Sequence, residues 1–231
     1  MSLEVSEIYS FYNRNIENWL SYKRIDVRKQ YLSLVDVKAG SYVLDIGCGC
    51  GIDMMLLSEM YDGISGVGID FSQEAIRIAQ KNVNHNEWEL KCEDFRKYTS
   101  ERKFDLIICS MLIMHYQDIR DIFHILKEWL APKGKILIVT NNPYLVVKDF
   151  ELDYDGVTSI EYQHRFEFSA TDVQHITKYL HPLSDYINKA YEEQLKLIKM
   201  KEISSYVDET LVFNPIHSTL PNFLAYVYEQ C

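Results

Sequence analysis

The chain has 231 residues, of which 47% are hydrophobic and 25% charged, a composition typical of a folded protein rather than a disordered one. A formal net charge of −10 disfavours a nucleic-acid partner, and the lack of any run of about 18 apolar residues predicts no membrane span. The acidic start of the chain indicates no targeting peptide, and five cysteines without a framework spacing favour a reducing, cytoplasmic setting.

The first part of the chain predicts helices that precede a strand and a glycine-rich loop. Apolar residues at helical spacing predict a helix over 3–20, and a second helix is predicted over 26–35. We interpret residues 1–36 as an N-terminal helical cover. A short buried strand over 42–46 then runs into glycines, and a helix is predicted over 52–60.

Strands and helices continue to alternate in the middle of the chain. Ser72 is a candidate N-cap for the first of the helices that follow. The further predicted strands are 64–69, 88–91, 104–109 and 135–140, and the further helices are 73–84 and 119–130. This alternation implies a parallel sheet with helices on both faces.

The pattern changes after Pro143. Two strands are predicted over 160–168 and 173–180, then a helix over 183–194 and two strands over 195–203 and 223–229. We expect an α/β fold with a seven-stranded, mostly parallel, doubly wound sheet. The chain is then one domain over 1–231, with a β-hairpin insertion over 143–182 as the substrate lid.

Glycines and acids follow the first three strands. The loop Gly47-Cys48-Gly49-Cys50-Gly51 lies where ligands of open α/β sheets bind, at the carboxyl ends of the strands. Asp70, about twenty residues further on, is placed to accept hydrogen bonds from both hydroxyls of an adenosine ribose. Asp94 and Phe95 follow the third strand, where a carboxylate can accept from an adenine amine and an aromatic ring can cover the base.

The charge beside the glycine loop indicates which cofactor it holds. A dinucleotide fingerprint has the spacing Gly-x-Gly-x-x-Gly and serves a pyrophosphate. Here the spacing is Gly-x-Gly-x-Gly, and Asp45 lies two residues before it. This carboxylate would repel a pyrophosphate but suits the ammonium group of a methionine moiety, so the pattern favours S-adenosylmethionine over NAD or FAD.

Five ordered segments resemble the class I S-adenosylmethionine-dependent methyltransferases of the small-molecule, methyltransferase-domain type. They resemble motifs I to IV and the approach to strand five: Val43 to Gly51, Gly68 to Ser72, Cys92 to Phe95, Phe104 to Ser110 and Leu130 to Ile138. The resemblance covers roughly residues 8–140, with a weaker echo over 221–225. It implies a Rossmann-like methyltransferase fold and S-adenosylmethionine as the cofactor.

The resemblance also implies roles for individual residues. The expected cofactor-binding residues are Asp45, Gly47, Cys48, Gly49, Asp70, Phe71, Asp94, Phe95 and Ser110. Asp45 helps to order the methionine part, Asp70 holds the ribose and Asp94 binds the adenine edge. No metal is expected, because Cys48 and Cys50 have no cluster of His or Cys partners.

The acceptor site is less determined than the cofactor site. The exit of strand four, residues 110–116, is apolar and ends in His115-Tyr116, which resembles small-molecule methyltransferases. His115 is a candidate general base or acceptor-orienting residue, with a helix-capping or core-edge role as the alternative. Tyr12 in the N-terminal helix and His164 in the insertion are the other catalytic candidates.

Two further patterns concern the insertion. Residues 141–144 are similar to the Asn-Pro-Pro-Tyr motif of amine methyltransferases, but they follow strand five instead of strand four, so we discount them. Alternation along a strand predicts two faces, with Tyr162, His164 and Phe166 on one and Gln163 and Arg165 on the other. Arg165 would suit a carboxylate or phosphate on the acceptor, or would be a solvated edge charge.

We therefore expect methyl transfer to the nitrogen or oxygen of a small-molecule acceptor by in-line displacement. The alternatives are a protein or RNA methyltransferase, which the acidic net charge disfavours, and a non-catalytic S-adenosylmethionine-binding protein. Neither the identity of the acceptor nor the oligomeric state follows from the sequence, and no membrane partner is expected.

Overall fold

The computed structural model describes residues 3–16, 24–156, 158–169, 171–204 and 221–231. The last positions of the first predicted helix, 17–20, therefore lie outside the described residues. None of the helices in the described ranges combines the length and the apolarity needed to cross a membrane.

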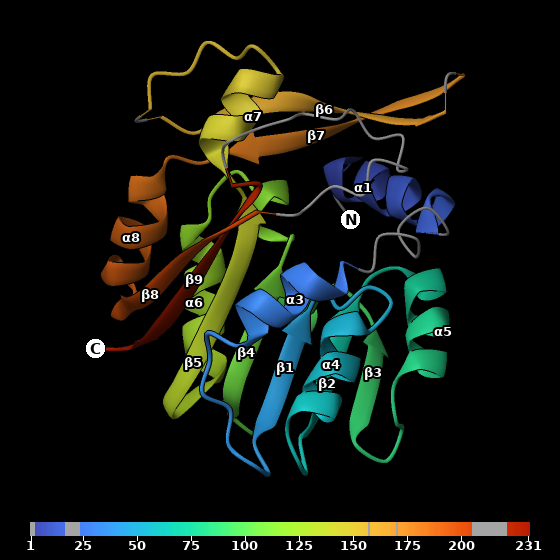
Figure 1. Ribbon diagram of the computed structural model, residues 1–231, viewed down its shortest axis with the longest axis vertical. Coiled ribbons are helices and arrows are strands. Elements are labelled where there is room, and N and C mark those ends of the chain that lie inside the picture. The colour runs from blue at the N-terminus through green and yellow to red at the C-terminus, as the bar shows by residue number, and fades with distance from the viewer. Residues whose placement is uncertain (1–2, 17–23, 157, 170, 205–220) are drawn as a thin grey trace.

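A seven-stranded sheet forms the centre of the molecule (Figure 1), in the order β3-β2-β1-β4-β5-β9-β8. The strands are β1 (Tyr42–Ile46), β2 (Ser65–Asp70), β3 (Trp88–Cys92), β4 (Phe104–Ser110), β5 (Leu130–Asn141), β8 (Leu195–Ile203) and β9 (Phe223–Gln230). Strands β1 to β5 are parallel, whereas β9 is antiparallel to both β5 and β8. The predicted α/β fold with a mostly parallel sheet is confirmed. Strand β5 begins earlier than predicted, because Leu130 already pairs with Phe104 across a register shift.

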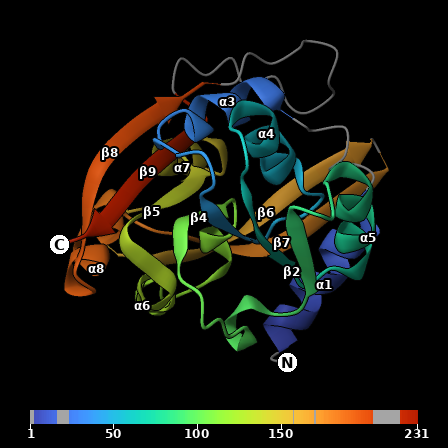
Figure 2. The same ribbon diagram turned by 90° about the horizontal axis from the view of Figure 1, so that it is seen from below.

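Helices cover both faces of the sheet, as Figure 2 shows from below. They are α1 (Leu3–Arg14), α3 (Ile25–Leu32), α4 (Ile52–Met60), α5 (Gln73–Asn82), α6 (Arg120–Trp129), α7 (Pro143–Asp149) and α8 (Leu183–Glu192), with the short 3-10 helices η1 (Phe95–Lys97) and η2 (Ile113–His115). One hydrophobic core joins the sheet to α6 and α8, and the other joins it to α3, α4 and α5. Ser72 caps α5 as predicted, because its Oγ accepts a hydrogen bond from the Ala75 amide at 3.1 Å.

Strand β1 is buried on both faces, as a central parallel strand should be. Leu44 and Ile46 contribute to the core beside α6, whereas Val43 contributes to the core beside α4. This packing holds the end of β1, and therefore the start of the glycine loop, in a fixed position.

The approach of β2 to β1 requires a glycine. A Cβ added to Gly66 would lie 1.9 Å from the carbonyl oxygen of its register partner Val43, and 2.9 Å from the Trp88 ring. We predict that Gly66→Ala lowers the free energy of unfolding by about 3 kcal/mol, because backbone atoms must move apart to admit the methyl group. Chemical denaturation measures this, with Ser65→Ala as the control on the same strand. Equal midpoints for the two variants would contradict the prediction.

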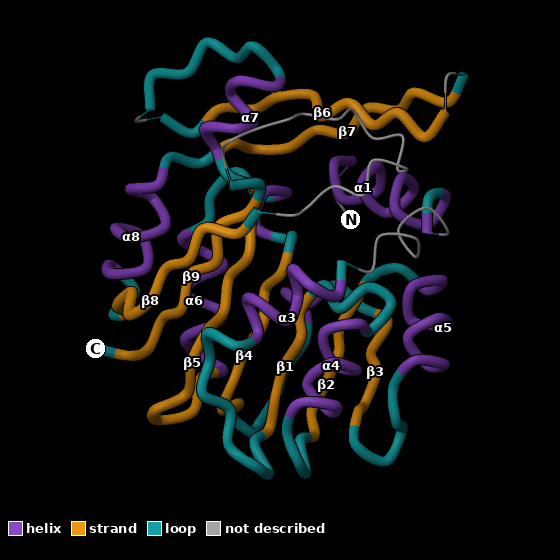
Figure 3. Tube along the Cα trace, in the orientation of Figure 1, coloured by secondary structure: helices purple, strands orange, loops and turns teal. Residues whose placement is uncertain are grey.

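A separate two-stranded sheet lies across the carboxyl ends of β1, β4 and β5 (Figures 1 and 3). It is the predicted hairpin, made by β6 (Ile160–Ser169) and β7 (Asp172–Leu180). A small hydrophobic cluster joins it to α1 through Phe11, Phe166 and Ile176. We call α1 and this hairpin the roof.

Helix α7 was not predicted. Its N-cap is Asn142, whose Oδ1 accepts from the Tyr144 amide at 3.1 Å, and Pro143 occupies its first turn, where no amide donor is needed. The run over 141–144 therefore follows strand five, as the sequence indicated, and starts a helix.

Candidate functional site

A cavity of about 560 Å³ lies between the carboxyl ends of the strands and the roof. Its size is within the range of small-molecule sites. It brings together most of the predicted site residues, namely Tyr12, Gly47, Cys48, Gly49, Asp70, Phe71, Asp94, Phe95, Ser110, His115 and His164. Asp45 is the one predicted residue that does not line the cavity, because it is buried beneath the glycine loop with 1% of its surface exposed.

The glycine loop and Asp70 form one structural unit. One carboxylate oxygen of Asp70, Oδ2, accepts from the Gly49 amide at 2.9 Å, and the other accepts from the Ser72 amide at 2.8 Å. A carboxylate oxygen has a second lone pair, so each can also accept a ribose hydroxyl. A Cβ at Gly49 would meet nothing within 4 Å, so the space beside the loop is open.

Negative charge accumulates beneath this loop. Burial and the nearby Asp53 and Asp70 carboxylates raise the pKa of Asp45, and Arg28 opposes this effect. The Arg28 guanidinium donates to Asp53 Oδ1 at 2.7 Å. Asp45 Oδ2 is buried and accepts no hydrogen bond from the described residues. A cationic ligand group at this end of the cavity would stabilise the carboxylates.

The sequence analysis did not identify the hydrogen-bond network that supports the glycine-loop end of the cavity. The Tyr31 hydroxyl donates to Asp53 at 2.7 Å and accepts from Ser110 Oγ at 3.4 Å, while Arg28 lines the cavity. Arg28 and Tyr31 come from α3 and Asp53 comes from α4, so only the packing of the two helices brings them together.

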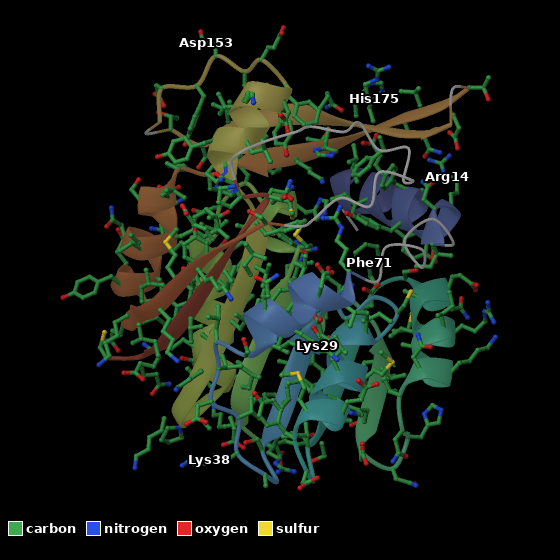
Figure 4. All side chains as sticks on the ribbon, in the orientation of Figure 1. Arg14, Lys29, Lys38, Phe71, Asp153 and His175 are labelled. Atoms are coloured by element: carbon green, nitrogen blue, oxygen red, sulfur yellow. The ribbon has the colours of Figure 1, made fainter. Side chains whose placement is uncertain are left out.

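These residues fit S-adenosylmethionine, which carries cationic ammonium and sulfonium groups, a ribose diol and an adenine. Asp70 offers two acceptors and Gly49 leaves open space, while the buried carboxyl of Asp45 lies beneath the loop and carries an oxygen without a hydrogen-bond partner among the described residues. Phe71 lies between α1 and the end of β2 (Figure 4), and its ring packs on Tyr9 with centroids 5.8 Å apart.

The carboxylate of Asp94, which the resemblance assigns to the adenine edge, already accepts hydrogen bonds within the protein. Asp94 lines the cavity, but its carboxylate accepts from the Arg96 side chain at 2.9 Å and from the Arg96 amide at 3.1 Å. These bonds lower the pKa of Asp94 against the opposing effect of its partial burial. An adenine amine would therefore share this carboxylate with Arg96. Phe95 is buried beside it and contacts Tyr116 edge to face.

Beneath the roof, the cavity contains a hydrogen-bonded pair of catalytic candidates. The Tyr12 hydroxyl lies 2.9 Å from His115 Nε2, although 103 positions separate the two residues in the sequence. His115 Nδ1 is buried and has no hydrogen-bond partner among the described residues. Burial and the charge of Lys178 lower the pKa of His115 to about 3, so the imidazole is neutral at physiological pH.

His164 lies on the inner face of the hairpin. Its ring packs against Phe166 at 4.3 Å and against Phe150 at 4.8 Å, and burial lowers its pKa to about 2. The predicted alternation is confirmed, because Tyr162 and Phe166 are buried while Gln163 and Arg165 are exposed; Arg165 nevertheless borders the cavity. Within the described ranges, no group of three His, Cys, Asp or Glu side chains could hold a metal ion.

Lys178 is a further cavity residue that sequence reasoning missed. Only 3% of its surface is exposed, and its Nζ lies 4.9 Å from the centroid of the Phe166 ring. Burial lowers its pKa to about 7. The signal in the sequence was its position opposite Tyr162, which places both side chains on the inner face of the hairpin.

Comparison with known proteins identifies a matching family and several relatives. The family model described as a methyltransferase domain matches residues 19–180. Phosphoethanolamine N-methyltransferase 1 of Triticum aestivum is 32% identical over 126 residues, covering 53% of this chain and 25% of that enzyme. Phosphoethanolamine N-methyltransferase of Plasmodium falciparum is 32% identical over 126 residues, covering 53% of this chain and 47% of that protein. The match thus covers less than half the length of these curated relatives.

A solved S-adenosylmethionine dependent methyltransferase from Mesorhizobium loti shares the fold. Its TM-score is 0.64 at 14% identity, and the match covers 87% of this chain and 95% of that one. At this identity the likeness shows the fold alone, and it confirms the predicted sheet architecture.

Proposed function

Because the chain belongs to the methyltransferase-domain family, we propose that it transfers a methyl group from S-adenosylmethionine to a nitrogen atom of a small-molecule acceptor. When bound, the cofactor supplies an electrophilic methyl group on a sulfonium. Nitrogen is the preferred nucleophile because two curated relatives, from wheat and Plasmodium, are named as N-methyltransferases.

The observation that carries the proposal is the Tyr12–His115 pair in the cavity. An amine attacks only as its free base, and an imidazole that stays neutral can accept a hydrogen bond from an N–H of that free base and so direct its lone pair at the methyl group. When His115 carries its proton on Nε2, that nitrogen donates to the Tyr12 oxygen at 2.9 Å and Nδ1 is left to accept. Tyr12 then acts by orienting the imidazole.

The roof provides the enclosed space that methyl transfer needs. Residues 1–36 and 143–182 contribute α1 and the hairpin, whose side chains line the cavity opposite the glycine loop. We propose that these segments position the acceptor and keep water from the reacting atoms. The whole chain then acts as a single catalytic domain.

We predict that His115→Asn lowers kcat about 100-fold while the Kd for S-adenosylmethionine stays within about threefold, because the lost group orients the acceptor nitrogen and does not bind the cofactor. Tyr12→Phe should lower kcat less, since it removes only the orienting hydrogen bond. Radiolabelled methyl transfer to a panel of small amines measures kcat, and calorimetry measures Kd. His85→Ala, at an exposed position outside the cavity, is the matched control.

Two outcomes would contradict this function. One is a protein that binds S-adenosylmethionine but methylates no amine in the panel, and the other is a His115→Asn variant with wild-type turnover. Parallel arms with total protein and RNA as acceptors test the macromolecular alternative, which predicts label in those fractions only.

A further inference from the structure

The two ends of the cavity differ in charge. Asp45, Asp53 and Asp70 surround the glycine-loop end, where Arg28 is the opposing cation. At the roof end, Lys178 lies close enough to lower the pKa of both His115 and His164. The cavity is therefore acidic beside the cofactor loop and basic beneath the hairpin.

Lys178 is held in place by its strand. It pairs in register with Tyr162 on β6, and its ammonium lies over the Phe166 ring at 4.9 Å. With 3% of its surface exposed, the side chain cannot reach bulk water as an ordinary surface lysine does. The side chain lines the cavity, as do His115, His164 and Phe166.

The protein supplies no counter-charge to this ammonium. Across the residues that the structure describes, Lys178 has neither a hydrogen-bond acceptor nor a carboxylate in ion-pair contact, and burial is the only influence on its pKa. His115 and His164, whose pKa values are lowered by burial and by the Lys178 charge, are neutral imidazoles and supply no negative charge. A buried cation without a partner is costly, and a bound anion removes that cost.

Asp149 does not supply the missing counter-charge, and Arg165 and Arg28 are themselves cations and cannot supply it. Asp149 of α7 borders the cavity, but Lys148 is the cation that acts on its pKa. Arg165 lies on the exposed face of the hairpin, opposite to the inner face that Lys178 shares with Tyr162. Arg28 lies at the other end, beside Asp53.

We propose that Lys178 binds the anionic group of the methyl acceptor, so that the substrate class is a small amine carrying a phosphate or a carboxylate. The acceptor lies with its anion under the hairpin and its nitrogen towards His115 and the glycine loop. This assignment rests on the proposed function for the identity of the bound molecule as the methyl acceptor. A neutral amine of the same length lacks the contact with Lys178.

Calorimetry on the full chain saturated with S-adenosylhomocysteine tests the anion site without requiring turnover. The titrants are phosphoethanolamine, β-alanine, ethanolamine and inorganic phosphate, so that the phosphate and carboxylate arms are separate. We expect at least one anionic amine to bind at least about tenfold more tightly than ethanolamine, and Lys178→Met to remove that difference. Lys178→Arg should restore part of it.

The matched control is Lys38→Met, because Lys38 lies at the opposite end of the molecule from the hairpin (Figure 4). It should bind every titrant as the wild type does. Lys178→Met should also leave the affinity for S-adenosylmethionine unchanged; an equal loss of cofactor affinity would assign Lys178 to the cofactor and overturn the proposal. If Lys178→Met fails to fold, Lys178→Gln takes its place with the same expectations.

Methylation of the same amines separates this inference from the proposed function. Lys178-dependent binding of an anionic amine without any methyl transfer would support the anion site and contradict the proposed reaction. Equal kcat/KM for ethanolamine and the anionic amines would overturn the anion site and leave N-methylation standing. Anion binding that is absent, or that survives in Lys178→Met, would also overturn it.

Discussion

Replacing Asp70 with Ala should weaken S-adenosylmethionine binding by about 1000-fold, measured as the Kd in calorimetry. In the cofactor site that we propose, the variant loses the acceptors for both ribose hydroxyls, and hydrogen bonds to a charged group contribute about 1.5–3 kcal/mol each. It also loses the Oδ2 bond to the Gly49 amide, at 2.9 Å, which holds the glycine loop in its observed position.

Asp70→Asn separates these two contributions. It keeps one oxygen for a backbone donor but loses the charge and one acceptor, so its loss of affinity should be smaller. Asp36→Ala, at an exposed position, is the control and should bind the cofactor as the wild type does. A Kd for Asp70→Ala within about threefold of wild type would remove Asp70 from the cofactor site.

The second large effect concerns stability. Lys178→Met should raise the free energy of unfolding by about 4 kcal/mol at pH 6.5. The pKa of Lys178 is lowered by burial to about 7, against roughly 10.4 in the unfolded chain, so folding opposes its protonation. The penalty is fully present below the folded pKa and declines as the pH rises towards the unfolded value. The gain from Met should therefore shrink by several-fold at pH 10.

Urea denaturation of both proteins at pH 6.5 and pH 10 measures the change. Lys38→Met serves again as the control, and its difference from wild type should be small and independent of pH, since Lys38 is exposed. A stability gain for Lys178→Met that is the same at both pH values would show that an altered protonation equilibrium is not its cause. Together with the binding test, the result would show that an acceptor contact is maintained at the expense of stability.

The cofactor half of the site could be predicted because its signals are local. One strand, one glycine loop and one helix follow each other directly, and the structure confirms the strand Tyr42–Ile46 and the helix Ile52–Met60 at the predicted bounds. Asp70 is placed by the end of the neighbouring parallel strand, which pairs in register with the first. Spacing along the chain was enough to bring these residues together.

The acceptor half depends on contacts between distant segments. No sequence spacing relates Tyr12 to His115, and the two meet only because α1 docks against the exit of strand four. Lys178 escaped prediction for a different reason. Alternation places it on the inner face of the hairpin, but a lysine there contradicts the rule that unpaired charges stay in water.

Helix α7 was missed because its first residues also resemble a catalytic motif. Asn142 and Pro143 were weighed as a possible catalytic motif, whereas an Asn N-cap followed by Pro is also a helix start. Asn142 and Pro143 therefore fit both a catalytic motif and the start of a helix, and their position after β5 favours the start of a helix.

The hydrophobic cluster of the roof is separate from the two cores of the sheet, and this separation affects how the chain can evolve. Phe11, Phe166 and Ile176 pack with one another, apart from the two cores that hold the sheet. Substitutions confined to this cluster therefore leave the two cores that hold the sheet in place. If the roof holds the acceptor as proposed, a directed-evolution library confined to the hairpin would change the acceptor contacts, whereas α1 also reaches the cofactor end through the contact of Tyr9 with Phe71.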